Sequence, residues 1–128
     1  MNGTQLRFIV QRHKTHHPHY DLRLETDEGF RSWILLKEPP TKENGSWLAI
    51  EDQEKDAPSI ISSEKIIEDG YGVGEAEKWD SGIYKIRQKN KSKILFEAEG
   101  KRLLGSFILL LPSWGIWSKK PLWVLIKY

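Results

Sequence analysis

The sequence predicts an all-β fold: a compact, closed β-barrel of about eight antiparallel strands with at most one short helix, in a single domain over residues 1–128. Two observations lead to this prediction. Apolar residues recur with a period of two through most of the chain, and turn-forming residues separate these short segments at intervals typical of a sandwich or barrel. Closure is favoured over an open sheet because it removes exposed strand edges.

Eight segments combine this alternation with the β-branched, aromatic and leucine side chains that suit a half-buried pleated surface. In chain order they are residues 6–11, 19–26, 30–37, 46–51, 82–88, 92–99, 103–111 and 122–127. Gly, Pro, Asn and Asp mark turns between them, for example at residues 43–45 and 112–115. Residues 59–69 are predicted as the one short helix, because serines precede an Ile66-Ile67 pair.

Composition limits the chemistry that this chain can perform. Its 128 residues, 38% of them hydrophobic, suffice for one domain with a real core, which the six tryptophans are expected mainly to fill. The absence of cysteine excludes a disulfide framework, a thiolate zinc site and a cysteine nucleophile. The longest apolar run, residues 107–111, is far below the ~20 residues of a membrane helix, and no apolar signal segment begins the chain. An intracellular, soluble protein is therefore expected.

All four histidines lie in one short stretch: His13, His16, His17 and His19. In the predicted strand 19–26, a period of two places His19, Asp21, Arg23 and Glu25 on one face and apolar side chains on the other. Imidazole and carboxylate are ligands that suit zinc, manganese or iron, and residues two apart on a strand can converge on one ion. His13, at the end of the preceding strand, is the natural third ligand.

Arg23 stands one step further along this face, where its guanidinium could hold a phosphate oxygen in a two-pronged contact. A metal beside an arginine is typical of phosphoryl chemistry, in which catalysis is mostly positioning and charge neutralisation. A structural interpretation stays open: the histidine-rich loop is then an incidental chelator, and Asp21 and Arg23 form a surface ion pair of little energetic value. In either interpretation, His16 and His17 are more simply explained as loop surface residues.

The C-terminal part of the chain is basic, since residues 81–128 carry ten Lys and Arg against two acidic residues. Five of these basic residues alternate in one stretch: Lys85, Arg87, Lys89, Lys91 and Lys93. On a regular strand, alternation places them on one face as a basic strip. Such a strip fits a polyanion-binding surface, and equally a solvated sheet face whose lysines oppose edge pairing.

Further motifs follow in order along residues 8–127. They read FIVQRH (8–13), HYDLRLE (19–25), SW (32–33), WLAIED (47–52), GYGVG (70–74), WDSGIY (79–84), GKRLLGSF (100–107) and WVLIK (123–127). Any one of these motifs is weak evidence, but their order is specific. Together they resemble the 3′-phosphoesterase domain of bacterial ligase D, which also occurs as small stand-alone proteins in archaea.

This resemblance implies a compact β-barrel with a surface groove and manganese-dependent healing of 3′ ends in DNA break repair by non-homologous end joining. The reactions implied are removal of a terminal 3′ ribonucleotide and of a 3′ phosphate. Carried over residue by residue, His13, His19 and Asp21 would be metal ligands, Arg23 would contact the scissile phosphate, and Glu51 would be a supporting carboxylate. The implied partners are DNA or DNA–RNA 3′ ends, with separate ligase and polymerase subunits, in a prokaryotic cytoplasm.

One departure from the family pattern affects the predicted chemistry. The family has a histidine after its Glu-Asp pair and a tyrosine a few residues later, whereas this chain has Gln53 and no histidine beyond His19. A neutral amide cannot act as a general acid, and loss of such a group removes ~10²–10⁴ in rate. His16, His17 or Gln53 would have to substitute. The phosphomonoesterase reaction suffers more than the phosphodiesterase reaction, because a dianion needs extra charge neutralisation.

The sequence therefore supports two functional hypotheses beside a purely structural one. The first is a manganese-dependent phosphoesterase whose catalytic set is His13, His19, Asp21, Arg23 and Glu51. The alternative is a non-catalytic nucleic-acid-end-binding module of a repair complex. In both, the residues expected to contact nucleic acid are Arg12, Lys85, Arg87 and Lys89. The structural hypothesis treats the histidine cluster as accidental.

Overall fold

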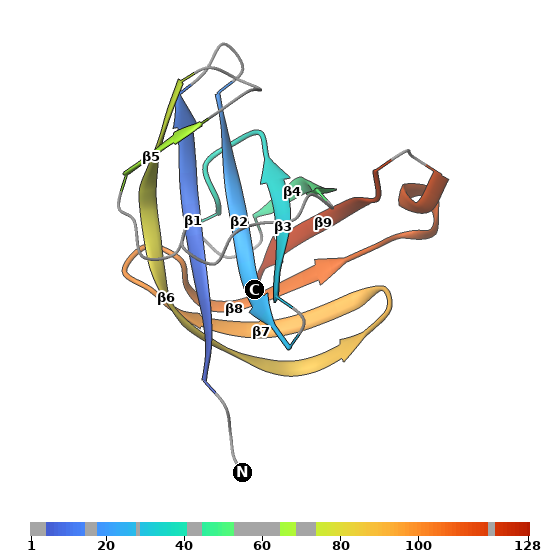
Figure 1. The fold of residues 1–128 in the computed structure, drawn as a ribbon. Coiled ribbons are helices and arrows are strands. Elements are labelled where there is room, and N and C mark those ends of the chain that lie inside the picture. Colours follow the sequence, from blue (N-terminus) through green and yellow to red (C-terminus); the bar gives the residue numbers. More distant parts are fainter. Residues whose placement is uncertain are drawn as a thin grey trace.

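The computed structural model of the protein describes residues 5–14, 18–27, 29–40, 45–52, 65–68, 74–117 and 120–128. These residues form nine antiparallel strands: β1 (Leu6–Lys14), β2 (His19–Thr26), β3 (Gly29–Leu35), β4 (Ser46–Asp52), β5 (Lys65–Glu68), β6 (Gly74–Asn90), β7 (Lys93–Glu99), β8 (Leu104–Leu110) and β9 (Leu122–Lys127). Eight of them follow the order β1-β2-β3-β4-β9-β8-β7-β6, and β6 pairs again with β1, which closes the barrel (Figure 1). The predicted closed β-barrel is confirmed.

The long strand β6 closes the barrel because it changes partners along its length. Its first residues pair with β5 on one side and β1 on the other, and from Ile83 onward it pairs with β7. Figure 1 shows β6 running from beside β5 at the top to β7 at the bottom. Between these two partners, residues 78–82 have β1 on one side and no paired strand among the described residues on the other.

The barrel interior is packed with large apolar side chains. Trp33 and Trp123 are fully buried and meet edge to face, with ring centroids 5.7 Å apart. Phe96 and Phe107 stack with centroids 5.5 Å apart. Such aromatic pairs bury a large apolar area and favour these offset or perpendicular geometries. The expectation that tryptophans mainly fill the core holds for these two and for Trp79, whereas the Trp114 side chain is exposed.

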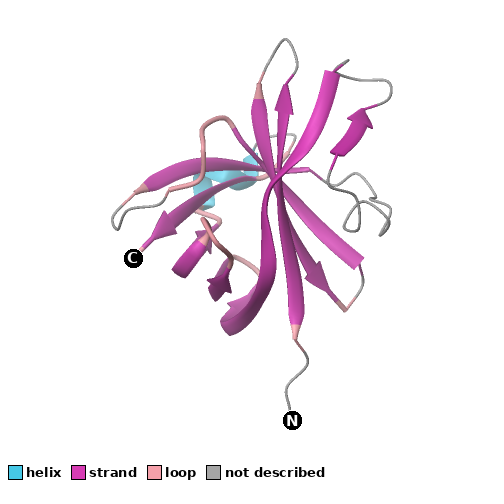
Figure 2. Ribbon diagram, turned by 90° about the vertical axis from the view of Figure 1, so that its left-hand side faces the viewer, coloured by secondary structure: helices cyan, strands magenta, loops and turns pink. Residues whose placement is uncertain are grey.

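The predicted helix at residues 59–69 is wrong where the structure describes it. Residues 65–68 form strand β5, which pairs antiparallel with β6. The rest of that segment lies outside the described residues. Within the described part of the chain, the only helix is a 3-10 turn, η2 (Ser113–Trp117), near the predicted turn at 112–115 (Figure 2). The described residues include no helix with the length and apolarity that a membrane span requires.

The predicted basic strip does not lie on one face of β6. The register between β6 and β7 shifts between residues 86 and 88, as in a β-bulge. Lys85 lies opposite the partly exposed Glu97, whereas Lys89 lies opposite the buried Ile94. Cross-strand partners share a face, and an extra residue at a bulge reverses the alternation. Lys85 and Lys89 therefore project from opposite faces.

Candidate metal centre

The hairpin of β1 and β2 brings together the two histidines that the sequence predicts as ligands. His13 and His19 are directly opposite partners in the antiparallel register. Their rings stack with centroids 4.5 Å apart and an interplanar angle of 13°. Asp21, two residues further along β2, lies opposite Gln11 and therefore on the same face of the sheet.

The carboxylate of Asp21 lies between the two imidazoles. Its Oδ2 is 2.8 Å from Nε2 of His13, and its Oδ1 is 3.5 Å from Nε2 of His19. One ligand atom from each of the three residues falls within 4.8 Å of the others. The side chains of His13, His19 and Asp21 are 3%, 13% and 10% exposed, so water has little access to the cluster. The predicted convergence of these three side chains is observed.

The donor set fits a divalent cation. Oδ1 of Asp21 is buried and accepts no hydrogen bond from any described residue. A buried acceptor without a donor is costly, and a cation would compensate for it. Two imidazole nitrogens and one carboxylate oxygen suit manganese, zinc or iron, and three protein ligands leave coordination positions open for water or substrate.

Arg23 lies beside this metal group, which comprises His13, His19 and Asp21. It is held by its own strand β2 and by the two strands that flank it, β1 and β3. Its Nε donates to Oε1 of Gln11 at 2.7 Å, and its Nη1 donates to Oγ of Ser32 at 2.9 Å. Its Nη2 lies 3.3 Å from Oδ2 of Asp21. With 8% of its surface exposed, this guanidinium is oriented before any ligand arrives.

Gln11 and Ser32 are parts of the site that were not predicted from the sequence. Gln11 carried a usable signal, because it stands two residues before His13 on one strand and therefore shares its face. Ser32 carried none, since its position opposite Arg23 depends on how β2 pairs with β3.

The structure does not bring Glu51 together with the metal group. Glu51 lies opposite Trp33 in the register of β3 and β4, on the face that looks into the barrel. Its Oε2 accepts hydrogen bonds from Nε and Nη2 of Arg31 at 3.1 and 2.9 Å, and its Oε1 accepts one from Nε1 of Trp123 at 2.9 Å. The next residue, Asp52, lies opposite Ser32 and therefore on the face of the sheet that carries the metal group. The catalytic role of Glu51 stays a prediction.

The three positions considered as substitutes for the family histidine, His16, His17 and Gln53, lie outside the described residues.

The basic residues expected to contact nucleic acid are spread over the barrel. Nη1 of Arg12 is 3.8 Å from Oε1 of Glu77 on β6. Glu77 precedes Lys85 on that strand by eight residues, which corresponds to roughly 26 Å. Arg87 is exposed, and its hydrogen bond to Glu97 at 2.7 Å lowers the pKa of that carboxyl. These residues therefore do not form one continuous surface.

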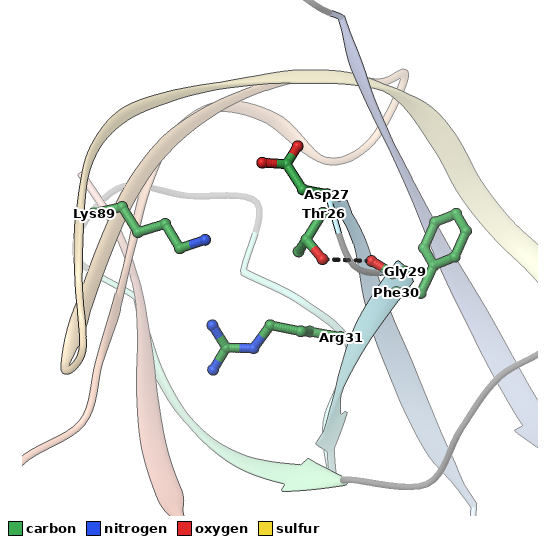
Figure 3. A pocket seen from close by; sticks show the side chains of 6 residues that line it. All are labelled: Thr26, Asp27, Gly29, Phe30, Arg31 and Lys89. Carbon is green, nitrogen blue, oxygen red and sulfur yellow. Dashed lines mark hydrogen bonds between the residues drawn. The ribbon is translucent and has the colours of Figure 1, made fainter.

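Lys89 lines a separate hollow of about 390 Å³ together with Arg31 and Asp27 (Figure 3). Figure 3 shows the Lys89 and Arg31 side chains reaching into this hollow from different strands. Because Asp27 lines it and Glu51 pairs with Arg31, carboxylates balance its positive charge.

Comparison with known proteins agrees with this geometry. The family model described as "DNA Ligase D 3′-phosphoesterase domain" matches residues 11–111, which include the metal group and Arg23. The chain is 28% identical over 121 residues to the multifunctional non-homologous end joining DNA repair protein LigD of Mycobacterium tuberculosis, covering 91% of this chain and 16% of that protein. It is 28% identical over 127 residues to multifunctional non-homologous end joining protein LigD of Pseudomonas aeruginosa, covering 95% of this chain and 15% of that protein.

The chain thus spans about one sixth of the length of these relatives. The matched region nevertheless covers more than half of the chain, including most of the barrel strands. The resemblance seen in the sequence motifs is confirmed, and the chain belongs to the DNA ligase D 3′-phosphoesterase domain family.

Proposed function

We propose that this protein is a metal-dependent phosphoesterase that acts on 3′ ends of nucleic acid in DNA end joining. One observation carries the proposal: the ligand atoms of His13, His19 and Asp21 lie within 4.8 Å of one another, with Nη2 of Arg23 3.3 Å from the same carboxylate. The family match and the names of the relatives support the 3′-end substrate and the repair context.

His13, His19 and Asp21 would hold the cation, with manganese as the proposed ion. When bound, this ion would neutralise charge on a phosphate oxygen. Asp21 would keep both imidazoles aimed at one point, since its two oxygens each face one Nε2. Arg23 would stabilise the negative charge that develops on the phosphate, and its hydrogen bonds to Gln11 and Ser32 would hold it there without reorganisation.

The proposed substrate is a phosphodiester, such as a 3′-terminal ribonucleotide, in preference to a 3′ phosphate. Gln53 stands at the place of the family histidine, and an amide neither donates a proton nor adds positive charge. A phosphate dianion would suffer more from this loss than a monoanionic diester. The proposed partners are DNA or DNA–RNA ends and separate ligase and polymerase subunits.

The same glutamine favours a second candidate, a module that binds nucleic-acid ends without turnover. Such a module would retain the metal group and Arg23 for phosphate recognition and would lack a proton donor to the leaving oxygen. The two candidates differ in turnover and share the metal requirement.

The deciding experiment incubates the protein and manganese with a labelled primer that ends in one 3′ ribonucleotide. Shortening that disappears on chelation and in His19→Ala supports the enzyme. His16→Ala and His17→Ala, assayed in parallel, show whether a loop imidazole replaces the family histidine. Salt-sensitive binding without shortening supports the module. Absence of metal uptake, binding and shortening contradicts both candidates.

A further inference from the structure

The outer surface of the barrel carries a patch of aliphatic side chains. On β4, β7, β8 and β9, buried residues that face the interior alternate with residues that face outward. The cross-strand register arranges eight of these outward residues and one residue of β3 in three rows of three. The first row is Ile34, Ile50 and Leu122, the second is Leu48, Val124 and Leu110, and the third is Ile126, Ile108 and Leu95. We call these nine residues the aliphatic face.

The aliphatic face is only partly covered. Leu48 is 42% exposed and the other eight side chains are half-buried, whereas inward residues such as Trp123 and Leu125 are at most 1% exposed. Side-chain positions on one face of a sheet are spaced roughly 4.8 Å by 6.8 Å, so nine of them cover roughly 300 Å². A contiguous apolar patch of this size on a monomer is often functional.

Further apolar surface borders the aliphatic face at η2. Gly115 of η2 is buried next to the backbone carbonyl of Leu122, with no room there for a side chain. Its neighbours Trp114 and Ile116 are exposed. Figure 1 shows this 3-10 turn beyond the ends of β8 and β9. Tryptophan is enriched in the cores of protein interfaces. The apolar surface therefore continues beyond the nine residues.

The chemistry of the aliphatic face excludes a nucleic-acid strand as its occupant. Backbone phosphates require cations or hydrogen-bond donors, and unpaired bases stack on aromatic or guanidinium groups. The nine leucine, isoleucine and valine side chains offer none of these groups. Aliphatic rows on a pleated sheet instead interdigitate with the apolar face of another sheet, as in a β-sandwich. The occupant is therefore a protein surface with similar rows.

The aliphatic face itself is such a surface, and its border does not oppose self-association. Two identical faces bring like charges together unless those charges are already neutralised. Next to the first row, Oδ1 of Asp52 lies 3.8 Å from Nζ of Lys120. Next to the third row, Oε1 of Glu97 accepts a hydrogen bond from Arg87 at 2.7 Å. Lys93, at the β7 end of the second row, has a long side chain that can extend into solvent beside a partner.

We propose that the aliphatic face is the interface of a homodimer, with Val124 of each copy at the two-fold axis. Val124 is the central residue of the nine, so an axis there superposes the two aliphatic faces. A stable interface buries about 800 Å² per partner, with an apolar core inside a polar rim. The roughly 300 Å² of the aliphatic face provides that core, and η2 and the paired border charges provide the rest. Two-fold dimers are the commonest homo-oligomers.

The dimer interface would end beside the metal group. Ile34, the first residue of the aliphatic face, lies directly opposite Asp21 in the register of β2 and β3. A second copy seated on the aliphatic face would therefore border one side of each metal group. The proposal itself does not rest on the proposed function, because its interface includes none of the residues of the metal group.

Sedimentation velocity over a range of protein concentrations tests the dimer. The wild type is expected to shift reversibly from monomer to dimer as its concentration rises. Leu48→Lys and Ile126→Lys should each raise the dimer Kd by more than about 100-fold, because each dimer would bury two unpaired ammonium groups. Ile83→Lys is the matched control, since Ile83 is a half-buried isoleucine of β6 that lies between Arg7 and Glu99 and outside the aliphatic face. Circular dichroism verifies that each variant is folded.

Cysteine cross-linking tests the centre of the interface. The chain contains no cysteine, so each single variant carries one thiol. Val124→Cys should form a disulfide-linked dimer under mild oxidation, because the two-fold axis brings the two copies of this position within reach of a disulfide. Ile83→Cys, treated in the same way, should remain a monomer on non-reducing electrophoresis.

A wild type that sediments as a monomer at every concentration would overturn the homodimer and would leave a different protein as the occupant of the aliphatic face. Unchanged dimer affinity in both lysine variants would also overturn it, as would equal cross-linking of the two cysteine variants. These readouts need neither metal nor nucleic acid, so they separate the dimer from the proposed function. A dimer that never shortens the primer removes the enzyme and keeps the interface, and an active monomer does the reverse.

Discussion

His13 and His19 face each other directly across β1 and β2, with their rings stacked 4.5 Å apart. A single hairpin therefore supplies both imidazoles and the carboxylate of Asp21, which follows His19 on the same face. Arg23 differs, because its orientation also requires Ser32 of β3. The arrangement of the candidate metal ligands and the position of the guanidinium thus depend on different parts of the fold, and we expect that they can be perturbed separately.

Removing a member of the metal group should strongly weaken metal binding while the barrel stays folded. Outer-shell partners alone change metal affinity by about 10–100-fold, so we expect His13→Ala and Asp21→Asn to lower manganese affinity by more than about 100-fold. Titration followed by the electron paramagnetic resonance of free manganese measures this. Asp52→Asn is the matched control, because Asp52 faces the same side and is outside the metal group. Equal affinity in Asp21→Asn and wild type would exclude Asp21 as a ligand.

Arg23→Ala should reduce turnover far more than metal affinity. In the proposed function, the guanidinium would meet charge that develops in the transition state, and loss of one such group costs about 10²–10³ in kcat. Single-turnover rates and manganese titrations on the same preparation provide the comparison. Arg23→Lys keeps the charge but cannot reproduce the hydrogen bonds to both Gln11 and Ser32, so it should rescue only part of the rate. Parallel losses of rate and metal affinity would show that Arg23 acts through the metal group.

Trp33 and Trp123, which are both fully buried, should respond differently to the same substitution. Nε1 of Trp123 donates to Oε1 of Glu51 at 2.9 Å, whereas Nε1 of Trp33 is buried without a hydrogen-bond partner among the described residues. Trp→Phe removes the same volume at both positions. We therefore expect Trp123→Phe to lower the free energy of unfolding by about 1–2 kcal/mol more than Trp33→Phe. Urea unfolding of both variants tests this, and the opposite order would contradict the role of the Glu51 hydrogen bond.

The ion pair between Arg7 and Glu25 should make stability depend on pH in the acid range. Nη2 of Arg7 lies 3.0 Å from Oε2 of Glu25, and the hydrogen bond from Arg7 lowers the pKa of Glu25 below its usual 4.5. A lowered folded-state pKa stabilises the protein above the unfolded-state value, and this contribution is lost as pH falls through the folded-state value. Glu25→Gln should therefore be less stable than wild type at pH 7, and the difference should shrink below about pH 4.5.

Urea unfolding at several pH values measures this difference. Glu99→Gln, which removes an exposed carboxylate of β7, is the control. A stability difference that is independent of pH would show that Glu25 does not titrate with a lowered pKa.

Local sequence patterns were sufficient to predict the fold class and the part of the site that strand β2 supplies. Alternation over residues 19–25 predicted correctly that His19, Asp21 and Arg23 share a face, because the pleat of one strand sets that relationship without reference to any other strand. Turn residues on either side of the apolar segments located most strands to within a few residues, because they set the local backbone conformation without reference to other strands.

Relationships between strands were not accessible in this way. Residues 66–67 suit a helix or a strand, and pairing with β6 made them part of β5. A bulge in β6 moved Lys89 to the face opposite Lys85, and the register of β3 with β4 turned Glu51 toward Arg31 and Trp123. Period two specifies which residues of one strand share a face; which strands become neighbours, and where an extra residue interrupts the alternation, depends on how the whole barrel packs and closes.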